Sequence, residues 1–266
     1  MNFVLMLLGI IVGTFVLRAP LRKAPGLFYL LAVAVDVAYV LAARGVLPRA
    51  VFSALSLPIG KCMLSLALFV VVMYIGVFPQ GSRVHQLLKP VRSELSILAC
   101  ILTGGHMAMY LASYAPQLGM GMSGNVMGAL AVALVLLVLL LVLGTTSFGV
   151  IKRHMSSDGW KRLQRWAYVF FGLVYIHLLL MLAPSAIRGG QTALASVAVY
   201  SVIFLGYAAF RLWRACADRR AAACSDVVTR AHCDKSSASP ADSWCEMSVL
   251  SAGADGLDDD VFEVLT

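Results

Sequence analysis

Long apolar runs recur along this chain, and short polar segments between them carry most of the charge. A helix needs roughly 20 apolar residues to cross a bilayer, because each residue adds only about 1.5 Å along its axis. The pattern predicts membrane-spanning helices at about 3–17, 25–43, 57–78, 95–115, 123–144, 166–184 and 193–213. We therefore expect an all-α polytopic helical bundle of seven transmembrane helices, or of six if the short first run does not span.

Composition supports that interpretation. The 266 residues are 61% hydrophobic and only 13% charged. Average soluble domains are about 45–50% apolar and about 25% charged, so this chain has more apolar surface than a soluble core needs. An ordinary soluble domain is therefore excluded, and membrane lipid is the expected surrounding.

Charge is distributed unevenly along the chain. Residues 1–215 hold 17 Lys or Arg and three acidic residues, whereas 216–266 hold four basic and ten acidic residues. The positive charges of the first part lie in short segments beside apolar runs, as membrane topology requires, so we expect no nucleic acid partner. The more basic segments follow the first, third, fifth and seventh runs. They predict a plasma-membrane protein with its N-terminus outside and its C-terminus in the cytoplasm.

The acidic segment 216–266 is rich in Ser, Ala and Asp and has few large apolar residues. We expect it to be a disordered cytoplasmic tail, because it has too little apolar surface to offset the entropy of ordering. Its four cysteines match no metal-binding spacing, which leaves their role open: Cys216, Cys224, Cys233 and Cys245.

Two histidines, His106 and His177, lie in the middle of predicted spans that run in the same direction. They follow the basic residues Arg92 and Arg165 by 14 and 12 residues, which predicts one depth, roughly 18–21 Å from the cytoplasmic charges. Two imidazoles at one depth can bind one haem iron from opposite sides. A proton or substrate path and locally bonded structural histidines are the alternatives. Gly105 would let a flat ring approach beside His106, although small residues also serve helix packing.

Two other ionisable residues lie within predicted spans, Asp36 and Lys61. They are expected to form an ion pair, because a buried charge in a membrane usually has a partner. In the functional alternative, Lys61 with Arg49 or Arg188 would neutralise the haem propionates, and Asp36 would relay a proton.

Two motifs point to a known family. One comprises Gly144-Thr-Thr-Ser147, a basic loop, Trp160-Lys-Arg-Leu-Gln-Arg-Trp-Ala-Tyr168 and then His177, and the other runs from Arg92 through Cys100 to His106. Over about residues 53–184 the chain resembles the ferric reductase-like transmembrane domain family. That family includes the haem-binding membrane subunit of the bacterial periplasmic methionine sulfoxide reductase system. The resemblance implies a haem b bundle that carries electrons across the membrane, with His106 and His177 as axial ligands.

The chain departs from that family at the cytoplasmic level. Many bacterial members have a histidine where this chain has Gln164, and the level-matched residue of the earlier span is Ser93. We therefore expect one haem. Segment 216–266 has no Gly-rich nucleotide-binding pattern, so the electrons are expected to come from quinol or from a cytoplasmic flavin reductase. They would pass to an extracytoplasmic flavoprotein, reductase or metal acceptor.

On this interpretation the protein is the membrane haem subunit of an oxidoreductase system. Residues 1–52 would form two helices, 53–184 the haem-binding core, 185–215 the last helix and 216–266 the tail. The alternative is a small-solute or proton-coupled transporter that uses intramembrane Asp, Lys and His as a polar path.

Overall fold

The computed structural model describes residues 2–79, 81–117 and 124–236, and all regular structure within these ranges is helical. Seven of its helical segments are long and apolar enough to cross a membrane. The predicted all-α bundle of seven spans is therefore confirmed, and the short first run is part of a 22-residue helix.

Six spans contain one long helix each, and the third is interrupted. The long helices are α1 (Asn2–Lys23), α2 (Pro25–Ala43), α6 (Arg92–Tyr114), α7 (Gly124–Ser147), α10 (Trp166–Ile187) and α11 (Gln191–Ser236). The third span consists of α3 (Arg49–Leu55), the π-helical turn η1 (Ser56–Gly60) and α4 (Met63–Ile75). Short helices lie between spans: α5 (Arg83–Leu88), η2 (Lys89–Val91), η3 (Ala115–Gln117), α8 (Gly149–Lys152) and α9 (Ser157–Gln164).

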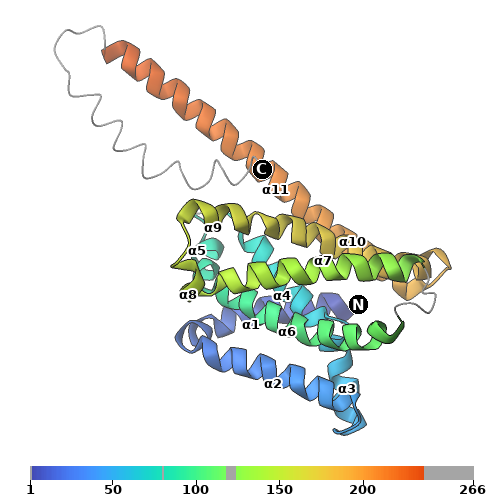
Figure 1. Cartoon of the computed structure of the whole chain (residues 1–266). Coiled ribbons are helices and arrows are strands. Elements are labelled where there is room, and N and C mark those ends of the chain that lie inside the picture. Colours follow the sequence, from blue (N-terminus) through green and yellow to red (C-terminus); the bar gives the residue numbers. More distant parts are fainter. Residues whose placement is uncertain (1, 80, 118–123, 237–266) are drawn as a thin grey trace. The chain divides into compact units, whose positions relative to one another are not determined.

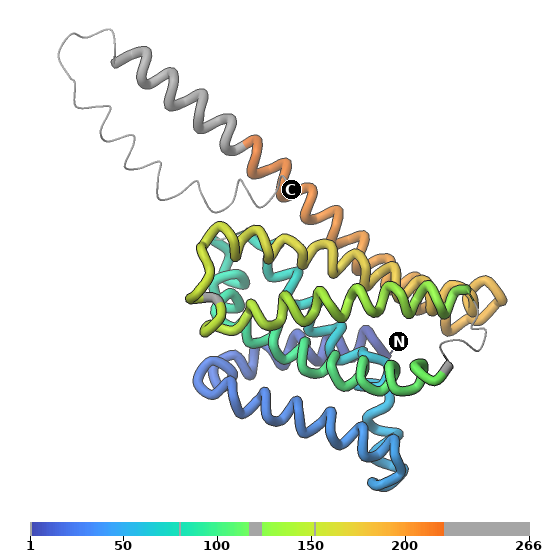
Figure 2. Tube along the Cα trace, in the orientation of Figure 1, coloured from blue at the N-terminus to red at the C-terminus, as the bar shows by residue number. Residues whose placement is uncertain are grey.

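The chain divides into two compact units, 1–205 and 206–266. In the first unit α6 is central, because it packs against α2, α4 and α7, and α7 packs in turn against α10. Figures 1 and 2 show α7 running beside α10, with α2 on the other side of α6. The C-terminal end of α6, the N-terminal end of α7 and the connection between α10 and α11 lie at one end of this bundle, which we call the cavity end (Figure 1). The short helices α5, α8 and α9 lie at the opposite end.

The expectation of a disordered tail is wrong for residues 216–236, because α11 continues to Ser236. Alanine is frequent here and is the strongest helix former. At the start of the segment, the Arg214 Nε lies 2.9 Å from an Asp218 carboxylate oxygen, an (i, i+4) ion pair of the kind that supports a helix. Residues 237–266, including Cys245, lie outside the described part of the chain.

The third span starts earlier than the sequence predicts and is broken near its middle. Pro58 lies within η1, where its ring cannot supply a backbone N–H to a regular helix. Cys62 has a left-handed φ of 56°, which costs a non-glycine residue roughly 1–2 kcal/mol. Gly60 packs so closely against α2 that a Cβ there would lie 2.6 Å from the Tyr39 hydroxyl oxygen. The break leaves the Gly60 carbonyl without a donor from the described backbone.

Candidate functional site

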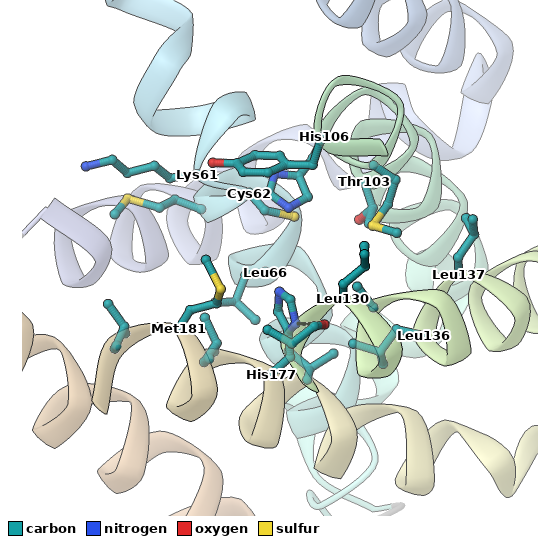
Figure 3. A pocket seen from close by; sticks show the side chains of 18 of the residues that line it. Lys61, Cys62, Leu66, Thr103, His106, Leu130, Leu136, Leu137, His177 and Met181 are labelled. Carbon is teal, nitrogen blue, oxygen red and sulfur yellow. Dashed lines mark hydrogen bonds between the residues drawn. The ribbon is translucent and has the colours of Figure 1, made fainter. Parts of the chain in front are cut away.

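A cavity of about 510 Å³ lies inside the first unit, between α4, α6, α7, α10 and the start of α11. Its walls are mainly Leu, Met, Val, Ala and aromatic side chains. Both predicted histidines reach it, His106 from α6 and His177 from α10. Figure 3 shows the two imidazoles entering one space from different helices. The volume lies within the range of about 300–1,000 Å³ that is typical of small-molecule and cofactor pockets.

His106 is oriented by the break in the third span. Its Nδ1 lies 2.8 Å from the Gly60 carbonyl oxygen. A carbonyl oxygen can only accept, so Nδ1 carries the hydrogen and donates it. The other ring nitrogen, Nε2, then has a free lone pair.

His177 has the same arrangement on the other wall. Its Nδ1 lies 3.1 Å from the Ala129 carbonyl oxygen of α7 and donates to it. The Ala129 carbonyl can accept this bond because an oxygen with two lone pairs can serve a helix donor and a side chain together. Metal-binding histidines usually donate their second ring N–H to a carbonyl or carboxylate, which fixes both tautomer and ring orientation. Both histidines therefore have the protonation pattern of a metal ligand at Nε2.

Aromatic rings continue from His106 towards the end of α6. The rings of His106 and Tyr110 have centroids 4.5 Å apart, and Tyr110 stacks on Tyr114 at 6.1 Å. All three side chains line the cavity. Because they follow one another at (i, i+4) spacing, they occupy one face of α6 up to its last residue.

Gly105 does not have the role that the sequence suggested. It is buried against α2 rather than lining the cavity, and a Cβ at this position would overlap the Asp36 carboxyl group. The reason is helical geometry, since adjacent residues point about 100° apart around the axis. His106 faces the cavity, and Gly105 faces the neighbouring helix.

The expected pair of Asp36 and Lys61 does not form. Asp36 is buried beside Gly105, and its Oδ1 has no hydrogen-bond partner in the described part of the chain. Lys61 is exposed and lines the cavity instead. Arg188 lies at the cavity end, where its Nε donates to the Pro184 carbonyl oxygen at 3.0 Å, and it does not line the cavity.

Sequence reasoning missed the backbone carbonyls that hold the histidines, and it missed Cys62. The Cys62 side chain lines the cavity, and its Sγ lies 3.1 Å from the Ser65 hydroxyl oxygen. One signal was present, because Pro58 and Gly60 within one apolar run indicate an interrupted helix. No such signal marks Ala129, which lies in a continuous helix.

The described residues contain no cluster of three or more His, Cys, Asp or Glu side chains that could hold a metal ion. A metal bound only by protein side chains commonly needs three or four of them. The cavity offers two imidazoles, which is the number that haem iron takes as axial ligands.

Comparisons with known proteins add a relative but no activity. A protein of Treponema pallidum (strain Nichols), described as an uncharacterized protein, is 38% identical over 177 residues, which are 64% of this chain and 49% of that protein. This chain therefore spans about half the length of that relative. No family model matches the chain, and no solved structure matches it.

The Asp36–Gly105 contact predicts a difference between two adjacent glycines. Gly105→Ala should destabilise the bundle by about 1–3 kcal/mol, because the new methyl group overlaps the Asp36 carboxyl group and forces α2 away from α6. Gly104→Ala is the matched control, since a Cβ there meets nothing within 4 Å. Unfolding of both variants in mixed detergent micelles measures the difference. Equal stability of the two variants would contradict the packing described.

Proposed function

We propose that the chain is the membrane subunit of an electron-transfer system and binds one haem b between His106 and His177. The observation that supports this is their matched geometry. Each imidazole donates Nδ1–H to a backbone carbonyl, which leaves Nε2 available at one shared apolar cavity. The chain supplies axial ligation and burial, which tune the potential of a haem, and the haem supplies one-electron chemistry.

The donor set fits haem better than a bare metal ion. A porphyrin provides four equatorial nitrogens, so two protein ligands complete the coordination. The mainly apolar lining suits the faces of a macrocycle, and Lys61 is the cation at the cavity that can neutralise a propionate. Arg188 does not line the cavity, so its proposed contact with a propionate has less support.

The proposed path of electrons follows the resemblance to the ferric reductase-like family. Electrons would enter from membrane quinol or a cytoplasmic flavin reductase. They would leave to an extracytoplasmic flavoprotein, reductase or metal acceptor. The cavity end would face outward, with the N-terminus outside and the C-terminus in the cytoplasm, because most cations of residues 1–215 lie at the opposite end.

A transporter is the weaker proposal. It needs Asp36, Lys61 and the two histidines to form one polar path, because an isolated polar group does not conduct a solute. Asp36 does not line the cavity and packs against Gly105 instead. The walls of the cavity are mainly apolar.

The ligand assignment predicts loss of colour from two single variants. Protein purified from haem-replete cells should show a reduced b-type absorption band, and His106→Ala and His177→Ala should each abolish it because each removes one axial nitrogen. His154→Ala is the matched control, since His154 is exposed, and its Nδ1 lies 2.8 Å from the Val150 carbonyl oxygen of the preceding helix α8. Colourless wild-type protein would refute the proposal.

The number of haems is a separate prediction. We expect a haem-to-protein ratio near one, because Gln164 and Ser93 stand at the level of a second site. Neither offers an imidazole, and the Ser93 hydroxyl donates to Glu94 at 2.8 Å. Haem extraction with quantitative protein analysis measures the ratio. A value near two would require a second ligand pair and contradict the single-haem proposal.

The proposed orientation predicts that a fluorescent protein fused to Thr266 folds in the cytoplasm and emits. Alkaline phosphatase fused at the same position should be inactive, because it matures only outside the cytoplasm. The reverse pair of results would invert the topology. That outcome would leave the seven spans unchanged.

A further inference from the structure

The cavity end of the bundle has an unusual balance of charge. Its connecting segments and adjoining helix ends contain three exposed arginines, Arg44, Arg49 and Arg188. The described segments 44–48, 115–117 and 188–190 contain no Asp or Glu. None of the three arginines forms an ion pair with a described residue. This end therefore has a positive charge that no carboxylate of its own segments balances.

Membrane topology does not account for these arginines. The positive-inside rule explains Lys and Arg at the opposite end and disfavours them at the outward end. Haem propionates do not account for all of them either, because Lys61 is the cation that lines the cavity. A binding partner with negative charge would explain why they are placed here without acidic neighbours.

The cavity that the two histidines line is also closer to this end. His106 lies 14 residues from Arg92 at the opposite end and eight from Tyr114 at the cavity end, distances of about 21 Å and about 12 Å along the axis. The stacked rings of Tyr110 and Tyr114 occupy the shorter interval. A molecule that docks at the cavity end is thus closer to a group held by His106 than a molecule that docks at the opposite end, and it can exchange electrons with that group over the shorter distance.

We propose that the cavity end is the docking surface for an anionic one-electron acceptor, attracted by Arg44, Arg49 and Arg188. This inference rests on the proposed haem function and adds the charge class of the acceptor. A reduced haem held by His106 and His177 would supply one electron, and the docked acceptor would be reduced by that one electron. No bond forms or breaks, and no proton is required.

Anion binding can be tested without haem. A nitroxide attached to Ile187→Cys, a position that is 84% exposed, would report on hexacyanochromate(III), a paramagnetic trianion, in nanodiscs of zwitterionic lipid. The exposed Cys216 and the tail cysteines would be replaced by serine. Spin relaxation should saturate with the trianion and weaken as salt screens the arginines. The triple variant Arg44→Gln/Arg49→Gln/Arg188→Gln should weaken binding by about tenfold or more.

The control variant Arg22→Gln/Arg83→Gln/Arg162→Gln removes the same charge from exposed positions at the opposite end. It should leave the relaxation unchanged. In haem-loaded protein, ferricyanide should oxidise the reduced haem about tenfold more slowly in the cavity-end variant than in the control. Linear relaxation in the wild type, or equal oxidation rates in the two variants, would overturn the docking proposal. If the purified protein binds no haem, the proposed function is refuted. The nitroxide experiment would still test anion binding at the cavity end, because it does not require haem.

Discussion

The hydrogen bond from His106 Nδ1 to the Gly60 carbonyl links the cavity to the fold of the third span. A regular helix uses each carbonyl for its own N–H ladder, and the break between η1 and α4 releases this one. The break has a cost, because Cys62 is left-handed and non-glycine residues disfavour that conformation by roughly 1–2 kcal/mol. A buried imidazole N–H without an acceptor would cost a similar amount, about 1–3 kcal/mol. The acceptor that the break provides for the His106 N–H therefore offsets the cost of the left-handed conformation at Cys62.

Close approach of α2 supports the same region from behind. Gly60 faces the Tyr39 hydroxyl group, and Gly105 faces the Asp36 carboxyl group, so two glycines on two different elements accept side chains of α2. Small residues commonly allow such contacts in membrane proteins, where helices associate through packing rather than through the hydrophobic effect. Tyr39 and Asp36 of α2 thus pack against the backbone that positions His106, and they do not line the cavity.

The seven spans were predictable because crossing a bilayer imposes length and apolarity on every helix. The convergence of His106 and His177 on one cavity was also accessible, since a fixed rise per residue converts sequence spacing into depth. The orientation of neighbouring residues was not. The spacing of residues along a helix gives the depth of Gly105 in the membrane, but it does not say which neighbouring helix Gly105 faces. The contact between Gly105 and Asp36 depends on helix packing, which the local sequence does not encode. The same limit explains the expected but absent pair of Asp36 and Lys61.

A single haem at His106 and His177 would constrain the choice of electron donor. The His106 position lies about 21 Å along the axis from the basic end of the bundle, and Gln164 stands where a histidine could have supported an intermediate site. Electron transfer slows steeply with distance, so a soluble flavoprotein at the basic end would face a long single step. A quinol dissolves in the bilayer and can approach the bundle at the depth of the cavity. One haem at this depth would therefore favour quinol over a cytoplasmic flavin reductase as donor, and a second haem would remove that preference.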